Sequence, residues 1–223
     1  TGDDITGTTT MALSTDVLNL HDTAIGIVAG TGTINSTQSF SQAAALNATT
    51  LNVDTGVLTL TAAGAHTIAT TVIDDGATLA TTGGGATVLT GDVTNNGTLT
   101  LATGDDITGT TTMADAADVL NLHDTAIGIV AGTGTINSGQ NLTTTATMGS
   151  TTLNVTGNTL SLGATATTVA LNTTSGATLN TNQYQVISNG DIALNGTAVW
   201  QLDINGTTTA GTDYGQITSS GAG

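Results

Sequence analysis

The chain contains two long stretches of nearly the same sequence, and this repetition limits its fold more than any other feature. Residues 1–36 recur as residues 103–138, and only three of these 36 aligned positions differ. Repetition at a fixed spacing is typical of proteins that stack similar structural units. The sequence therefore predicts two repeat modules, residues 1–102 and residues 103–223, and the second module ends in divergent coils.

A shorter period of about 20 residues runs inside each module. Small apolar clusters recur at this spacing, and several alternate apolar with polar residues, as in VLTL at residues 57–60 and TLTL at residues 98–101. Alternation with a period of two places leucine on one face of a β-strand and threonine on the other. Gly, Asn and Asp, which favour turns, stand between the clusters. The central apolar residues of the clusters are Leu18, Phe40, Leu58, Leu79, Leu99, Leu120, Leu142, Leu160, Leu179 and Val199.

Short strands at this spacing predict an all-β fold, namely a β-solenoid (parallel β-helix) with coils of about 20 residues. A β-sandwich would place its strands about 8–12 residues apart and would not need long identical stretches. Ordering one such coil costs about 20–40 kcal/mol, whereas burying five or six aliphatic side chains contributes about 10–15 kcal/mol. Stacking between neighbouring coils must supply the rest, so the open ends of a stack are expected to be capped or docked.

Composition excludes several classes of function. The chain has no Lys, Arg, Cys or Pro, and its formal net charge is −16. Without cations it has no means of neutralising phosphates, so we expect neither nucleic-acid binding nor attraction to an anionic membrane. Its longest apolar run is far shorter than the roughly 20 residues that cross a bilayer, so we expect no membrane insertion by this segment. A hydrophobic fraction of 38%, mainly Val, Ile, Leu and Ala, argues against disorder.

Three pairs of adjacent aspartates stand beside glycines, in TGDDITG twice and in IDDG once. Paired carboxylates on such turns suit Ca²⁺, which binds hard oxygen ligands in flexible loops. The alternative is a turn in which the carboxylates accept hydrogen bonds from backbone amides. Sixteen carboxylates without an internal cation also favour diffuse binding of divalent ions. No cofactor is required by the sequence, and the candidate Ca²⁺ ligands are Asp3, Asp4, Asp74, Asp75, Asp105 and Asp106.

Histidine–aspartate pairs occupy the same place in both copies, His21–Asp22 and His123–Asp124. Such a pair can orient a general base, but no nucleophile recurs with a recognisable sequence, and no third metal ligand accompanies the pair. Since duplication copies structure as readily as function, we interpret both pairs as residues at strand ends or corners. Carboxylate pairs also hydrolyse glycosidic bonds, yet cations are absent and aromatic residues make up only 2% of the chain, which leaves little to hold a sugar. We therefore predict that the chain is not an enzyme.

Several phrases resemble the autotransporter-associated β-strand repeats of bacterial surface proteins. They are GTGTIN at residues 30–35 and 132–137, NNGTLTL at residues 95–101, GATL, and the tail at residues 200–221. The tail resembles the G-T-D-Y-D-Q-[LI] ending of a repeat block in that family, with Gly215 where Asp is more usual. The resemblance spans most of the chain. It implies a right-handed parallel β-helix, as in passenger domains, adhesins and giant surface proteins, with no shared catalytic residue.

These observations predict an extracellular structural protein at the bacterial cell surface, a repeat segment of a fibre, sheath or surface layer. We expect a mature product or a piece of a longer protein, because the chain begins at Thr1 without an initiator Met or a basic signal start. Self-association, end to end or lateral, is the expected partnership. The alternative is the stalk of an adhesin or autotransporter passenger that binds a surface glycan or host ligand. A third hypothesis is a Thr-rich ice-binding solenoid, although Thr-x-Thr recurs in only some coils, as at residues 98–100.

Overall fold

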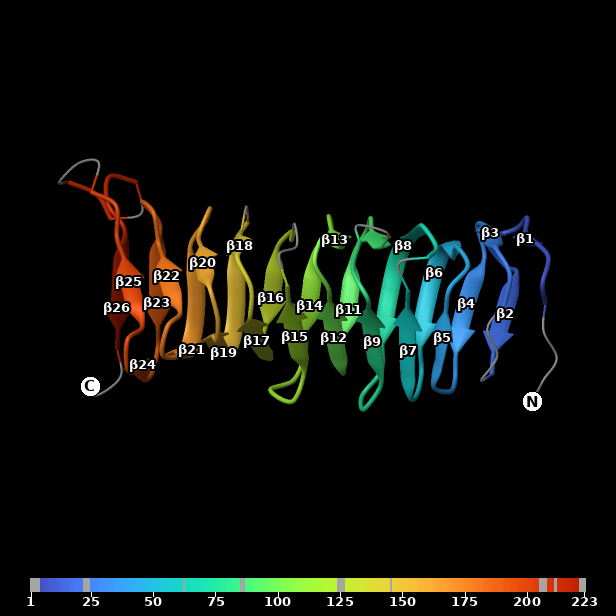
Figure 1. Cartoon of the computed structure of the whole chain (residues 1–223), viewed down its shortest axis with the longest axis horizontal. Helices are drawn as coiled ribbons and strands as arrows, with labels where there is room; N and C mark the ends of the chain where they lie inside the picture. The colour runs from blue at the N-terminus through green and yellow to red at the C-terminus, as the bar shows by residue number, and fades with distance from the viewer. Residues whose placement is uncertain are drawn as a thin grey trace. The chain divides into compact units, whose positions relative to one another are not determined.

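The computed structural model describes residues 5–21, 25–61, 63–84, 87–123, 127–144, 146–204, 208–210 and 212–220. The chain divides into two compact units, residues 1–112 and residues 113–223. All regular secondary structure in the described residues is β-strand (Figure 1). In each unit the chain winds in coils roughly 19 residues apart, and strands of successive coils pair in parallel. The predicted β-solenoid is therefore confirmed.

Three parallel ladders run through unit 1, and each coil contributes a short strand or half of a longer strand to each ladder. The first ladder comprises β2 (Val17–Leu20), β4 (Thr33–Ser36), the second half of β6 (Asn47–Val53) and of β8 (His66–Ile73), β11 (Val93–Asn95) and the start of β14 (Thr111–Met113). The second comprises β5 (Phe40–Gln42), β7 (Val57–Leu60), β9 (Thr78–Thr81) and β12 (Thr98–Leu101). The third comprises β1 (Thr9–Met11), β3 (Val28–Gly30), the first half of β6 and of β8, β10 (Thr87–Leu89) and β13 (Asp106–Ile107).

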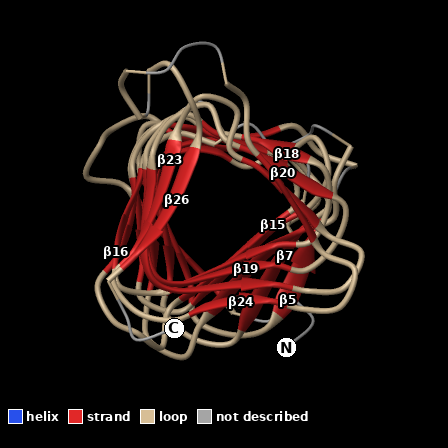
Figure 2. Cartoon of the chain, turned by 90° about the vertical axis from the view of Figure 1, so that its left-hand side faces the viewer, coloured by secondary structure: helices blue, strands red, loops and turns tan. Residues whose placement is uncertain are grey.

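Unit 2 has the same three-ladder plan, and in Figure 2 its strands lie along three sides. The first ladder comprises β15 (Val119–Leu122), β17 (Thr135–Ser138), the second half of β19 (Met148–Val155) and of β21 (Ala166–Thr173), and β24 (Ile192–Leu194). The second comprises β18 (Leu142–Thr143), β20 (Thr159–Ser161), β22 (Thr178–Asn180) and β25 (Val199–Gln201). The third comprises β16 (Val130–Gly132), the first half of β19 and of β21, β23 (Gln185–Ser188) and β26 (Gln216–Ser219).

The apolar period of the sequence corresponds to the second ladder. Phe40 pairs with Leu58, Leu58 with Leu79 and Leu79 with Leu99, and these three leucines are fully buried. The strand TLTL of β12 alternates half-buried threonine with buried leucine, as predicted from its period of two. Because paired residues of a parallel ladder lie about 4.8 Å apart, each leucine packs on those above and below it. The core of unit 1 is therefore a set of continuous apolar columns.

Two of the predicted central residues do not fit this column. In unit 2, Leu179 pairs with Trp200 and not with Val199, whose side chain is half exposed. Trp200, which is half buried, takes the ladder position that the sequence analysis assigned to Val199. Leu18 lies on a different ladder, since it pairs with Ile34 of β4. The period is real, but the residues chosen to mark it come from more than one side of the coil.

Candidate functional sites

The carboxylate pairs lie in unlike surroundings. Asp74 and Asp75 are exposed at the predicted corner, where Gly76 has a φ of 74°, a left-handed conformation that glycine tolerates best. Asp105 is fully buried, whereas its neighbour Asp106 is half buried and begins β13. Consecutive residues of an extended strand project to opposite sides, so these two carboxylates do not face one ion. Asp3 and Asp4 lie outside the described residues.

No group of three or more Asp, Glu, His or Cys side chains with the spacing of a metal site occurs within the described ranges. Ca²⁺ normally takes six to eight oxygen ligands. The exposed pair at Asp74 and Asp75 would therefore have to recruit backbone carbonyls and water to hold such an ion. Ca²⁺ binding at the aspartate pairs stays a prediction.

Asp105 has a structural arrangement of its own. Its two carboxylate oxygens accept hydrogen bonds from the backbone N–H groups of Gly83 (3.2 Å) and Thr87 (3.1 Å), which belong to the preceding coil. Buried amides need a partner, because an unsatisfied one costs about 1–3 kcal/mol. Asp105 thus joins two successive coils from inside unit 1. The sequence could not distinguish it from Asp3, which stands in the same phrase TGDDITG.

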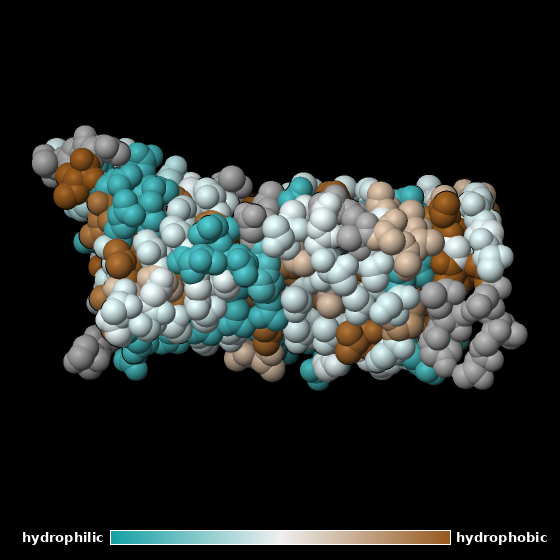
Figure 3. Space-filling view, viewed as in Figure 1, coloured by the Kyte–Doolittle hydropathy of each residue, from teal (hydrophilic) through white to brown (hydrophobic). Residues whose placement is uncertain are grey.

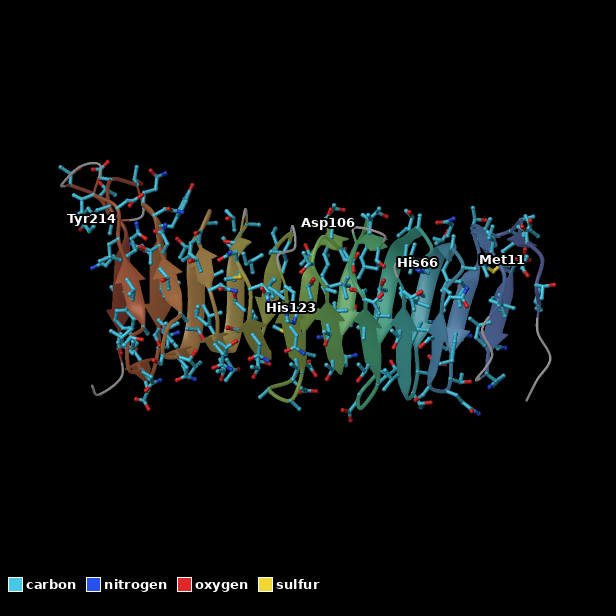
Figure 4. All side chains as sticks on the ribbon, viewed as in Figure 1. Met11, His66, Asp106, His123 and Tyr214 are labelled. Carbon is cyan, nitrogen blue, oxygen red and sulfur yellow. The ribbon has the colours of Figure 1, made fainter. Side chains whose placement is uncertain are left out.

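His66 is a buried polar residue that sequence reasoning missed. It is fully buried on the third ladder, and Figure 4 places it among the strands of unit 1. Its Nδ1 accepts a hydrogen bond from the backbone N–H of Leu46 (3.2 Å), and its Nε2 lies 3.1 Å from the carbonyl of Thr61. The two partners together assign a neutral ring that carries its proton on Nε2. The alternation in HTIATTVI places His66 on the same face as Ile68, which was the available signal.

Acidification is expected to destabilise the protein through His66. Burial lowers the pKa of His66 from its ordinary value of 6.5, and the hydrogen bond to Thr61 and the charge of Asp105 oppose this shift only in part. Between the pKa of His66 in the folded chain and its higher pKa in the unfolded chain, the unfolded chain binds more protons than the folded chain. The stability contributed by neutral, buried His66 is therefore complete above about pH 6.5 and is lost as the pH falls through the folded pKa. Urea unfolding midpoints measured from about pH 7.5 to about pH 5 check this expectation.

The variant His66→Ala should have a smaller fall in its unfolding midpoint over that pH range, whatever its stability at neutral pH. His21→Ala is the matched control, because His21 is exposed at a corner. If His66→Ala retained the full pH dependence of the parent and His21→Ala abolished it, the assignment to His66 would be wrong.

The repeated histidines lie at coil corners, directly after β2 and β15 respectively, as their structural interpretation predicted. His21 Nδ1 lies 2.6 Å from the hydroxyl of Thr37 in the next coil. His123 faces Gly139 at the same corner of unit 2, and Gly139 has no side chain to bond (Figure 4). Their neighbours Asp22 and Asp124 lie outside the described residues. At this corner His21 therefore has a threonine hydroxyl within hydrogen-bond distance, whereas His123 has a glycine in its place.

Asparagine ladders follow the outer surface of the first ladder in both units. In unit 2, each of three side-chain amides donates to the carbonyl oxygen of the preceding asparagine, at 2.7, 2.8 and 2.9 Å. In unit 1 two such bonds occur, at 2.8 and 2.9 Å, and Val72 then takes the next position. Stacked amides satisfy one another and fix the register between coils. The asparagines are Asn19, Asn35 and Asn52 in unit 1 and Asn121, Asn137, Asn154 and Asn172 in unit 2.

An open, shallow groove of about 330 Å³ lies on the third ladder of unit 2. It is lined by Ile129, Ala131, Met148, Gly149 and Thr167, among others, and Ile129 is exposed. Gly149 stands where the first copy has Asn47, so the second copy lacks a side chain there. The lining is mostly apolar and brings no titratable side chain into the groove. The groove suits contact with a small apolar group.

Residues 208–210 and 212–215, before β26, lie outside the solenoid coil, at the place where Figure 4 labels Tyr214. Asp213 accepts hydrogen bonds from the hydroxyl and backbone N–H of Thr208 and from the N–H of Thr209 (3.1 Å). The hydroxyl of Thr208 contributes most to lowering the pKa of Asp213. The Asp of the phrase GTDYGQI therefore acts as a turn-forming acceptor. The indole Nε1 of Trp200 donates to the hydroxyl of Thr173 (3.0 Å), which anchors the last coil.

Exposed large apolar side chains concentrate in the first two coils of unit 1 and the last coil of unit 2, and Figure 3 shows brown patches toward the right and at the left of the view. The face drawn in Figure 3 also has a broad teal area in the left half of the view and further brown patches along its lower edge. Isolated exposed apolar residues are ordinary, but clusters at unpaired strands indicate a surface that another element covers. The residues are Ile5, Leu13, Val17 and Ile27 in unit 1 and Leu194, Val199, Leu202 and Ile204 in unit 2.

The fold defines each unit as a parallel β-solenoid, and the described sites are structural contacts between coils. No family model, curated protein or solved structure matches the chain. Among the described residues there is no helix long and apolar enough to cross a membrane.

Proposed function

We propose that the chain is an extracellular structural protein, a repeat segment of a bacterial surface fibre, sheath or surface layer that associates end to end. The observation that carries this proposal is the pair of open strand edges. Among the described residues, β1 pairs only with β3 and β2 only with β4, while β24 and β25 each continue a ladder with no further strand beyond them. Such edges pair readily with another chain. A head-to-tail contact that does not close into a ring produces a filament.

The mechanical part of this role follows from the ladders. Each coil is joined to the next by parallel backbone hydrogen bonds, by apolar columns and by the asparagine ladders. Bending would have to stretch many of these bonds together, so the coils resist it. The absence of Lys and Arg leaves no site for trypsin-like proteases, which suits a protein exposed outside the cell. The resemblance of GTGTIN and NNGTLTL to autotransporter-associated repeats supports the same location.

The alternative is an adhesin or passenger stalk that binds a surface glycan or host ligand. The groove beside Gly149 supports the form with a host ligand that presents a small apolar group, because its lining is mostly apolar. Gly149 in the lining stands where the first copy has Asn47, and such a difference between copies is expected if one copy had acquired a binding role. Glycan array binding that is lost in the variant Gly149→Asn would support this function over a purely structural one.

Ice binding has less support than either. An ice-binding face needs threonine at the same two outward positions in successive coils. The outward columns of the first ladder in unit 1 are instead mixed, because the column beside Thr33 and Thr50 consists of asparagine and then Val72. An assay of ice recrystallisation tests this third hypothesis.

Association of the purified chain is expected to increase with salt and with protein concentration. A net charge of −16 repels a second copy when the Debye length is about 30 Å, at about 10 mM salt, and much less when it is about 8 Å, at about 150 mM salt. Sedimentation velocity at the two salt concentrations measures the effect, and electron microscopy shows whether the larger species are elongated. Chains that stay monomeric at high concentration and high salt would contradict end-to-end association.

A further inference from the structure

Unit 1 contains the same six residues in two different environments. ITGTTT at residues 5–10 recurs at residues 107–112, within the same unit. Ile107 is 1% exposed, because β13 pairs with β10 and places Ile107 beside Leu89. Ile5 is 43% exposed. Within the described part of the chain, the second copy therefore has a covering strand and the first copy has none.

The covered copy shows in detail how a preceding coil fits this sequence. Thr111 pairs with Val93, and the N–H of Val93 donates to the carbonyl of Thr110 (2.9 Å). At the corner before this pair, the carboxylate of Asp92 accepts the N–H of Thr110 (3.0 Å). One residue earlier, Gly109 lies against the backbone of Gly91 so closely that a Cβ atom would collide with it. The contact thus combines a strand pair, a capped amide and two facing glycines.

Among the described residues, no coil lies on the corresponding side of the uncovered copy. A Cβ atom built on Gly7 would meet nothing within 4 Å among the described residues, although Gly7 is the counterpart of Gly109. Thr9, the counterpart of the fully buried Thr111, is half buried and pairs only with Val28 on its other side. The edge before β1 is therefore shaped for a coil like that of Gly91, Asp92 and Val93.

The last coil of unit 2 carries the matching phrase. The phrase Gly190–Ile192 corresponds to Gly91–Val93. The correspondence follows from the ladder pairs, because Ile192 pairs with Leu171 and Val93 pairs with Thr71, the equivalent of Leu171 in unit 1. A Cβ atom on Gly190 would crowd the carbonyl of Val169 just as one on Gly91 would crowd that of Ala69. Val93 is 1% exposed, whereas Ile192 is only half buried. Asp191 is exposed at the corner.

Nothing in the described residues of unit 2 lies on the free edge of β24. The C-terminal strand β26 pairs with β23, where Gln216–Ser219 matches Gln185–Ser188, and Ser220 donates to the carbonyl of Ser188. That strand covers the third ladder, and the hydroxyl of Ser219 donates to the carbonyl of Gly190 (2.8 Å). Ser220 takes the place on Ser188 that Thr108 takes on Leu89 in the covered copy, so a second copy can stack here only from Gly7 onward. The first ladder is left with β24 as its last strand.

We propose that a second copy of this chain stacks its β1 on β24 in the register seen between β14 and β11. Ile192 then pairs with Thr9 of the second copy, and Ala193 pairs with Thr10. The carboxylate of Asp191 accepts the N–H of Thr8, and Gly190 faces Gly7. This inference rests on the proposed end-to-end association and specifies the residues that form its interface.

Cysteine cross-linking tests the register directly, because the chain has no cysteine of its own. Chains with Ala193→Cys are mixed with chains with Thr10→Cys and oxidised at a salt concentration that favours association. Disulfide-linked heterodimers are expected at a yield at least tenfold above that of the control, in which Asn180→Cys replaces Ala193→Cys. Asn180 lies in β22 on the second ladder, out of reach of Thr10 in this register. Equal yields in both mixtures, or no heterodimer, would overturn the proposed register.

Gly7→Val gives a second, independent test. A Cβ atom at Gly7 meets no described atom of its own chain within 4 Å, so the thermal unfolding midpoint should stay that of the unsubstituted chain. It would collide with Gly190 of the second copy, so the association constant from sedimentation should fall at least tenfold. Gly139→Val is the matched control, because Gly139 lies at a mid-unit corner with only ordinary contacts, and it should associate like the parent.

The two kinds of failure are distinguishable. If the unsubstituted chain associates and Gly7→Val associates with the same constant, this interface is overturned, while end-to-end or lateral association through other residues is not. A parent chain that stays monomeric in sedimentation and forms no specific cross-link would overturn both proposals.

Discussion

Replacing Gly132 by alanine is expected to destabilise unit 2 by about 3 kcal/mol or more. Gly132 ends β16 with a φ of 121°, and a Cβ atom there would collide with the carbonyl oxygen of Met113. The same oxygen accepts the N–H of Thr133 (3.0 Å), so the collision also breaks a hydrogen bond between coils. Urea unfolding followed by circular dichroism measures the loss.

The control for this prediction is Gly176→Ala in the same unit. Gly176 also has a positive φ, 83°, but a Cβ atom there would meet nothing within 4 Å among the described residues. Only the left-handed conformation is then unfavourable, at about 1–2 kcal/mol. A loss for Gly132→Ala no larger than that for Gly176→Ala would show that backbone conformation, and not the close approach of two coils, decides the requirement for glycine.

Asp105→Ala is expected to destabilise unit 1 by about 2–5 kcal/mol, because it leaves two buried amides without an acceptor. These are the N–H groups of Gly83 and Thr87, which the carboxylate now holds. Asp105→Asn should lose less stability, since the single side-chain carbonyl of asparagine still accepts a hydrogen bond from one of the two amides. Hydrogen exchange measured by NMR should show faster exchange of both amides in the alanine variant.

Asp75→Ala is the matched control, because Asp75 is an exposed aspartate at a corner of the same unit. Its substitution should change stability by no more than about 0.5 kcal/mol. If Asp105→Ala and Asp75→Ala had equal effects, the buried carboxylate would have no part in joining the coils.

The fold could be predicted from the sequence because, in a solenoid, residues one period apart in sequence lie beside each other in adjacent coils. When each coil has nearly the same length, residues one period apart become paired residues of a parallel ladder, as Leu58, Leu79 and Leu99 show. The alternation within TLTL then decides which side faces the core. Neither step needs knowledge of distant parts of the chain. The structural interpretation of His21 and His123 as corner residues succeeded for the same reason.

The buried polar residues could not be predicted in this way. His66 and Asp105 are polar and stand in phrases that read as ordinary strand or turn, yet both are fully buried and bonded to backbone groups of other coils. Their partners Leu46 and Gly83 are about one coil away in sequence. The alternation in HTIATTVI indicates that His66 faces the core, but no local pattern shows which group of the preceding coil its ring will bond.

The sequence by itself determined the period, the strand faces and the absence of cationic chemistry. Only the tertiary structure decided which copy of an identical phrase is covered, since Ile107 is buried and Ile5 is exposed, and Gly109 is crowded where Gly7 is open. The physical reason is that burial in a solenoid depends on whether another coil lies on the strand. That is a property of the stack, and identical residues at its middle and at its edge therefore have different environments.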